Sequence, residues 1–320
     1  MAATTSDAAA ARTTALKCIS LLNPDIQKSC FLLKQACQDS GFFFVVDHGI
    51  SQDLTDEVFF QSKMFFGLPL QEKMKLLRNK KHRGYTPKLD ELLDPENQVI
   101  TKKDITLELR YLRMIIKQTN LFMGQISGPQ KMFYLGGGML WRSTIEKPYA
   151  DFFDKKEMLD EPIATLRLLH YEDKVSDPAM GIYGCGAHSD FGFLTLLATD
   201  DVMGLQICKD KDARPRIWEY VPPLKGAFVV NLGDMLERWS NGVFRSTLHR
   251  VIGHGQERYS IVYFVEPSHE CIVECLPSCT SEVNPPKYSP IICSTYLSQR
   301  YRETHLYLDS YHRNEARGKV

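Results

Sequence analysis

The hydrophobic pattern divides the chain into a helical N-terminal part and a strand-rich remainder. Residues 26–39 repeat apolar side chains every three or four positions, which predicts an amphipathic helix that stops before Gly41. Residues 42–46 are aromatic and β-branched, which predicts a short strand. Helical patterns return at 53–67 and at 70–79, the latter opened by Pro69.

From Pro162 the pattern changes to short apolar segments between turn residues, which is typical of strands. The expected strands are Ala164–Tyr171, Leu194–Ala198, Leu205–Cys208, Trp218–Val221, Ala227–Leu232, Thr247–Val251 and Tyr259–Val265. Strands in such close succession predict a sandwich or barrel, and the jelly roll is one double-sheet form of this architecture. The sequence therefore predicts an α+β chain with a mainly β core behind an N-terminal helical and strand region.

Composition adds limits on partners and location. Lys+Arg and Asp+Glu are both 39, so no net field favours nucleic acid. The apolar runs are too short to cross a bilayer. Residues 1–15 are Ala/Thr-rich without an apolar signal core, and we expect a short disordered tail there. Nine cysteines, an odd number, suit a reducing compartment. We therefore expect a cytoplasmic monomer that binds neither nucleic acid nor membrane.

Cys271, Cys275 and Cys279 are spaced regularly and resemble a metal site at first sight. Their spacing lacks the two-residue interval of zinc knuckles. Alternating cysteines on strand-like sequence are more often simply buried thiols. We interpret them as structural.

Two histidines and an aspartate form the candidate catalytic metal site. His188 and Asp190 are two residues apart, so both side chains would leave one face of an extended segment. His249 lies in a second strand-like segment. Two imidazoles and a carboxylate are the ligand set that holds non-haem Fe(II) and leaves coordination positions open. Because isolated His-x-Asp pairs are common, the assignment depends on the motifs around it.

Two further features bear on the chemistry. Arg258 and Ser260 supply a guanidinium fork and a hydroxyl, the pair needed to hold a carboxylate-bearing cosubstrate. A zinc hydrolase is the alternative, since two histidines and a carboxylate also bind zinc, but His-Glu-x-x-His is absent. An apolar shell that protects the metal site from solvent is expected from Phe191, Phe193, Leu194 and Leu196.

At these residues the chain resembles the plant-type 2-oxoglutarate/Fe(II) dioxygenase family, which includes isopenicillin N synthase. The other segments that carry the resemblance are Asp39–Ile50, Leu166–Tyr171, Val230–Leu236 and Trp239–Gly242. The resemblance implies a distorted jelly roll, or double-stranded β-helix, that binds Fe(II) through His188, Asp190 and His249.

The resemblance also implies a cosubstrate and a reaction. 2-Oxoglutarate would chelate the iron, and its far carboxylate would meet Arg258, Ser260 and Tyr171. 2-Oxoglutarate and O2 would become succinate and CO2 while a small organic molecule is hydroxylated or desaturated. Relatives that use the same ligands without 2-oxoglutarate keep a second possibility open. Plant secondary metabolism is the expected setting.

The resemblance divides the chain into an N-terminal dioxygenase domain at 16–99 and a jelly-roll domain at 150–312. Residues 100–149 depart from the family pattern. Codons that encode Lys102–Arg110 and Leu121–Pro129 can be read one base earlier as family-like sequence. We hypothesise that this segment is an out-of-frame reading. The altered segment leaves open an inactive or unstable family member.

Overall fold

A computed structural model describes residues 13–78, 84–87, 93–94, 158 and 163–304. The segment 100–149 and the start of the predicted tail lie outside the described residues. Thr14, which falls within that tail, is buried and donates its backbone N–H to the Tyr220 carbonyl at 2.8 Å.

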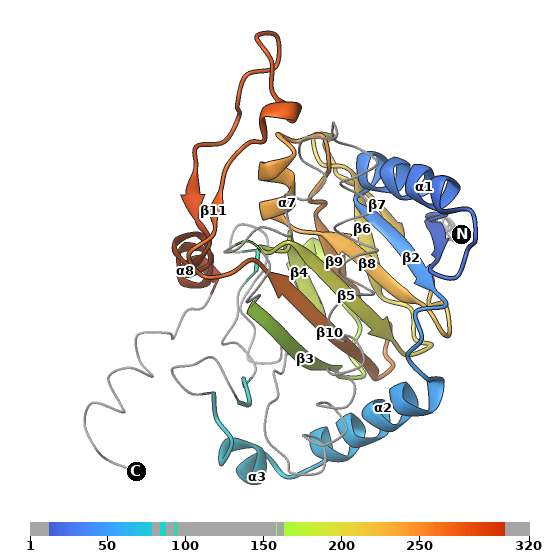
Figure 1. Cartoon of the computed structure of the whole chain (residues 1–320). Helices are drawn as coiled ribbons and strands as arrows, with labels where there is room; N and C mark the ends of the chain where they lie inside the picture. Colours follow the sequence, from blue (N-terminus) through green and yellow to red (C-terminus); the bar gives the residue numbers. More distant parts are fainter. Residues whose placement is uncertain (1–12, 79–83, 88–92, 95–157, 159–162, 305–320) are drawn as a thin grey trace, which may run out of the picture.

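Two sheets form the core of the molecule (Figure 1). The major sheet has the order β1-β2-β8-β5-β10-β3, and the minor sheet β4-β9-β6-β7. The major strands are β1 Lys17–Ser20, β2 Phe42–Val46, β8 Phe228–Leu232, β5 Leu194–Thr199, β10 Arg258–Glu266 and β3 Ile163–Tyr171. The minor strands are β4 Cys185–His188, β9 His249–Val251, β6 Leu205–Asp210 and β7 Ile217–Tyr220. The predicted jelly roll is confirmed.

The N-terminal region is built into the jelly roll. Strand β2 pairs antiparallel with β8, and β1 pairs parallel with β2. Helix α1, Ile26–Asp39, packs on β1 and β2, while α2, Gln52–Phe66, packs on β10 and β3 (Figure 1). The helical patterns predicted at 26–39 and 53–67 are thus confirmed. Helix α3, Leu70–Met74, is shorter than predicted.

The remaining described elements lie outside the two sheets. They are α7 Asp234–Trp239, β11 Ile272–Val273, β12 Ile291–Ile292 and α8 Cys293–Thr304, with short 3-10 turns at Pro178–Met180 and Pro277–Cys279. The Trp239 indole is fully buried and packs edge-on against Phe193, with the ring centroids 5.8 Å apart.

Strand alternation sends neighbouring residues to opposite faces of the major sheet. Side chains of Phe42, Phe44 and Val229 meet Leu205 and Ile207 of the minor sheet and fill the interior between the sheets. The intervening residues of β2, β5 and β8 face α1 and the outer core. Alternate residues of each strand therefore point into the interior between the sheets, and the residues between them point away from it.

Gly41 fixes the entry of the chain into β2. Its φ is +66°, and an added Cβ would lie 2.0 Å from the Arg245 carbonyl oxygen. We expect Gly41→Ala to lower the free energy of unfolding by at least about 2 kcal/mol, measured by chemical denaturation. Gly49→Ala is the matched control, because Gly49 has φ +80° but no atom within 4 Å of such a Cβ. Equal losses in both variants would show that the close approach is unimportant.

Candidate active site

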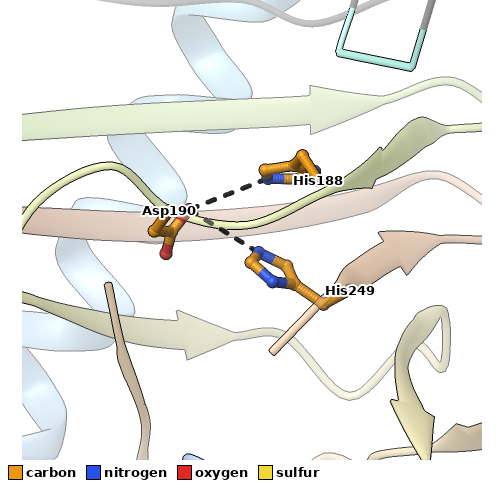
Figure 2. A group of neighbouring side chains, drawn as sticks. All are labelled: His188, Asp190 and His249. Atoms are coloured by element: carbon orange, nitrogen blue, oxygen red, sulfur yellow. Dashed lines mark ion pairs between the residues drawn. The ribbon is translucent and has the colours of Figure 1, made fainter. Parts of the chain in front are cut away.

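The three predicted metal ligands come together at one end of the interior (Figure 2). His188 ends β4, His249 begins β9, and these two strands are paired with the histidines opposite each other. Asp190 Oδ1 lies 3.8 Å from His188 Nε2 and 3.6 Å from His249 Nε2. One potential ligand atom from each residue falls within 4.8 Å of the others, so the group can hold a metal ion.

Asp190 does not share a strand with His188. Strand β4 ends at His188, and Asp190 lies in the loop that leads to β5. The side chains of His188 and Asp190 nevertheless reach the same site. The loop is held by backbone hydrogen bonds to the start of α7, where Asp234 N–H donates to the Asp190 carbonyl at 2.8 Å.

Backbone carbonyls orient both imidazoles. His188 Nδ1 lies 2.8 Å from the Gly186 carbonyl oxygen, and His249 Nδ1 lies 3.1 Å from that of Thr247. A ring that donates through Nδ1 presents an unprotonated Nε2 to a metal. The carbonyl two residues before each histidine thus fixes the orientation of its ring.

The carboxylate is oriented by two polar side chains from the major sheet. Asp190 Oδ2 accepts hydrogen bonds from Thr195 Oγ1 at 2.5 Å and Asn231 Nδ2 at 2.6 Å, which leaves Oδ1 for the metal. Burial alone raises the pKa of Asp190, but His249, His188 and these two donors outweigh it and lower the pKa below its usual range. The Asp190 side chain is therefore an ionised carboxylate that can bind a metal cation.

The apolar surroundings differ from the expectation. Leu194 and Leu196 face α1 on the other side of the sheet. The predicted shell was therefore wrong at these two positions. Phe42 instead meets the site, with its ring edge-on to His249 and the centroids 5.4 Å apart. A run of five apolar residues, Phe42–Val46, does not reveal in sequence which side chains point inward.

Arg258, Ser260 and Tyr171 form a buried polar group in the same interior. Arg258 pairs with Tyr171 across β10 and β3, and its Cζ lies 5.0 Å from the Tyr171 ring centroid. All three side chains are buried. Burial raises the pKa of Tyr171 to about 12, which keeps its phenol protonated as a hydrogen-bond donor at neutral pH.

The Arg258 guanidinium has no carboxylate within ion-pair distance among the described residues, although its charge partly offsets the burial that raises the pKa of Asp200. Its Nε donates to the Val202 carbonyl at 3.3 Å, whereas Arg258 Nη1 and Ser260 Oγ are buried without a hydrogen-bond partner. A buried guanidinium is costly unless it is paired. Gly204 packs closely against it, because an added Cβ would lie 2.9 Å from the Ile252 carbonyl oxygen and 3.2 Å from Arg258 Cδ. The arrangement fits a carboxylate supplied by a ligand.

The three cysteines singled out in the sequence form no such site. Cys271 is buried, and its Sγ lies 3.4 Å from Met158 Sδ. In the described part of the chain, the triad is the one cluster of histidine, cysteine and acidic side chains with metal-ligand spacing. No helix in this part is both long and apolar enough for a membrane span.

Thr195 and Asn231 were not predicted as site residues. We expect Thr195→Val, which keeps the shape but removes the hydroxyl, to weaken metal affinity about 10–100-fold. The measurement is a titration with Co(II), followed by its absorption. Thr55→Val is the control, because the Thr55 hydroxyl bonds to the Ser51 carbonyl on α2, away from the triad. An unchanged affinity in Thr195→Val would show that Thr195 does not orient the carboxylate.

The fold and this geometry define a jelly-roll protein with a candidate metal centre and an adjoining anion-binding group. Comparison with known proteins makes the class specific. Residues 163–267 match the 2OG-Fe(II) oxygenase superfamily, and residues 16–113 match the N-terminal region described as non-haem dioxygenase in morphine synthesis.

Plant proteins are among the similar sequences. Kihadalactone A synthase LFS of Citrus sinensis is 41% identical over 315 residues, covering 90% of this chain and 92% of that protein. Azadirone synthase LFS of Melia azedarach is 39% identical with the same coverage. The chain therefore belongs to the 2OG-Fe(II) oxygenase superfamily, as a dioxygenase that uses Fe(II) and 2-oxoglutarate to oxidise a small molecule.

Solved structures agree in fold and ligand. A full-length Neurospora crassa protein, in complex with alpha-KG and thymine, superposes with a TM-score of 0.73 at 25% identity over 90% of this chain and 96% of that one. JOX2, in complex with 2OG, Fe and JA, gives 0.73 at 26% identity over 91% and 86%. The zinc hydrolase alternative has no support from these findings.

Proposed function

We propose that His188, Asp190 and His249 bind the Fe(II) of this dioxygenase. Support comes from the 3.6 and 3.8 Å separations between Asp190 Oδ1 and the two imidazole Nε2 atoms. The fixed Nδ1 contacts and the two donors to Oδ2 give three preset ligand atoms. When bound, Fe(II) would supply the site at which O2 and the cosubstrate react.

Arg258, Ser260 and Tyr171 are proposed to bind the far carboxylate of 2-oxoglutarate. The observation that carries this assignment is the buried, unpaired Arg258 Nη1 beside the buried Ser260 hydroxyl. Both groups lie on β10, on the face that Val262 shares with Tyr171 and Val251. A cosubstrate fixed here at its far end would present its 2-oxo acid end toward the triad.

The protein's own contribution is to bind, orient and exclude water. The guanidinium fork and two hydroxyl groups hold the cosubstrate, and the protonated phenol of Tyr171 donates to it. Phe42 shields His249 on the interior side. Because the prime substrate is not fixed by these residues, the same centre can hydroxylate or desaturate it.

The prime substrate is proposed to be a small molecule of plant secondary metabolism. Two plant relatives with about 40% identity are named as synthases of kihadalactone A and azadirone. We further propose a cytoplasmic monomer without nucleic-acid or membrane partners, on the balanced charge. We also propose three regions: an N-terminal dioxygenase domain at 16–99, an out-of-frame segment at 100–149 and a jelly-roll domain at 150–312. Sequencing the transcript tests the reading frame of residues 100–149.

The test of the site is anaerobic spectroscopy on the whole chain. Addition of Fe(II) and then 2-oxoglutarate should give a weak visible metal-to-ligand charge-transfer band. Admission of O2 should release succinate. A band without succinate would indicate an inactive family member, and oxidation of substrate without any need for 2-oxoglutarate would indicate the 2-oxoglutarate-independent alternative. No band at saturating concentrations would refute the site assignment.

A further inference from the structure

A cavity of about 310 Å³ lies between α1 and the outer face of the major sheet, on the opposite side of that sheet from the metal triad. Its floor is formed by apolar side chains of β2, β5 and β8. They are Phe43, Val45, Leu194, Leu196 and Val230. The iron site described above does not use this cavity.

Helix α1 covers the cavity, and the turn that precedes the helix forms its mouth. Leu33 and Cys30 project from the helix over the floor, while Leu22 and Ile26 stand at the mouth with 77% and 57% of their surface exposed. Interior packing in proteins leaves few voids larger than a water molecule. A cavity of this volume, lined by apolar groups, is in the range of small-molecule pockets, and apolar cavities bind apolar molecules in preference to water.

Ser29 is the buried polar side chain of the cavity lining, and its hydroxyl has hydrogen-bonding capacity left. The Ser29 side chain is 7% exposed and accepts a hydrogen bond from Asn23 Nδ2 at 3.0 Å. Within the part of the chain that the structure describes, its hydroxyl proton is donated to no acceptor. A hydroxyl carries one donor as well as two acceptor positions. Ser29 can therefore donate to a carbonyl oxygen of a ligand.

The cavity floor is the reverse side of the metal site. Leu194 and Leu196 flank Thr195, which donates to Asp190. On β8 the same alternation separates Val230 from Asn231, the second donor to Asp190. A molecule against the floor would thus contact the strands that position the carboxylate.

We propose that this cavity is a second ligand site for a neutral, largely apolar molecule with a carbonyl group, and that its occupancy is coupled to the metal site. Among the described residues that line the cavity none has an ionised side chain, so a charged ligand would lack a partner there. Ser29 supplies a directed contact from the buried part of the lining.

The binding test uses prodan, a neutral naphthalene ketone whose fluorescence reports an apolar environment. The wild-type chain should bind it saturably. Cys30→Phe fills the cavity and should weaken binding at least about tenfold while keeping a cooperative melt. Cys18→Phe is the matched control, since Cys18 is exposed on β1 and does not line the cavity. Equal affinity in all three proteins, or no saturable binding to the wild type, would overturn the proposal.

A milder variant tests the directed contact even if Cys30→Phe does not fold. Ser29→Ala should weaken prodan binding about 3–10-fold, the effect of one lost hydrogen bond. Dimethylaminonaphthalene, which lacks the ketone, should bind both proteins equally. An equal loss for both compounds would remove the assigned role of Ser29.

The coupling is tested by measuring prodan binding with and without Mn(II) plus 2-oxoglutarate under anaerobic conditions. Coupled sites change each other's affinity, and we expect a change of at least about fivefold. Identical dissociation constants would overturn the coupling. This part rests on the proposed metal site, so uptake of Mn(II) is measured separately by its paramagnetic resonance signal. Failure of uptake would refute the metal site, whereas prodan binding to the metal-free chain would stand.

Discussion

Asp190→Ala is expected to abolish succinate formation and the charge-transfer band together. The substitution removes the one carboxylate of the triad, and it leaves two imidazoles that provide neither the charge nor the third ligand. Loss of an outer partner of a metal ligand costs about 10–100-fold in affinity, so loss of the ligand itself should exceed about 100-fold. Titration with Co(II) and a succinate assay measure the two effects.

The folded state of this variant should persist. Thr195 and Asn231 lose their acceptor, which leaves two buried polar groups without a partner and lowers stability by about 1–3 kcal/mol each at most. Asp201→Ala is the matched control, because Asp201 is exposed. If Asp190→Ala retains wild-type metal affinity with a normal melt, His188 and His249 do not form an iron site with it.

The hydrophobic pattern of the sequence predicted most strands of the two sheets. Each expected strand was found, and the apolar segments predicted as β3 and β10 matched the ends of both strands to within a residue. Strand β4, Cys185–His188, was not predicted, because two small residues, Gly186 and Ala187, give it no hydrophobic signal. Its place in the minor sheet depends on pairing with β9, which is a tertiary contact.

The three residues proposed as metal ligands were predictable from the sequence, whereas the side chains that orient them were not. Asn231 is the one polar residue of β8, and Thr195 is a buried polar residue among the apolar residues of β5. A buried polar position of this kind needs a partner, and this was the available signal for both residues. The direction of Leu194 and Leu196 could not be inferred, because both faces of β5 are buried and the alternation is lost.

Arg258 was predicted to bind the cosubstrate from its type and its spacing to Ser260, and its burial, which the sequence does not show, supports that proposal. Arg258 is 3% exposed and Ser260 is 1% exposed. An arginine on the surface of a strand would give the same sequence pattern as a buried one. The buried Arg258 Nη1 without a hydrogen-bond partner supports the proposed ligand-binding role.

Arg258→Met is accordingly expected to have the second large effect, on the KM for 2-oxoglutarate. Truncating one partner of a buried, hydrogen-bonded charge pair costs about 2–5 kcal/mol, or roughly 30- to several-thousand-fold in affinity. Steady-state succinate assays give the KM, and loss of the charge-transfer band at sub-saturating cosubstrate gives an independent value. Affinity for Co(II) should stay unchanged, since Arg258 is not a metal ligand in this assignment.

Graded substitutions separate charge from geometry at the same position. Arg258→Lys keeps the charge without the fork and should recover only part of the affinity. Tyr171→Phe removes a single donor, and its phenol is protonated throughout because its pKa is raised to about 12 by burial, so we expect only about a 3–10-fold rise in KM with no new pH dependence near neutrality. Arg302→Met, at an exposed position on α8, is the control. Wild-type KM in Arg258→Met would mean that the far carboxylate binds elsewhere, and the buried guanidinium would then need another partner.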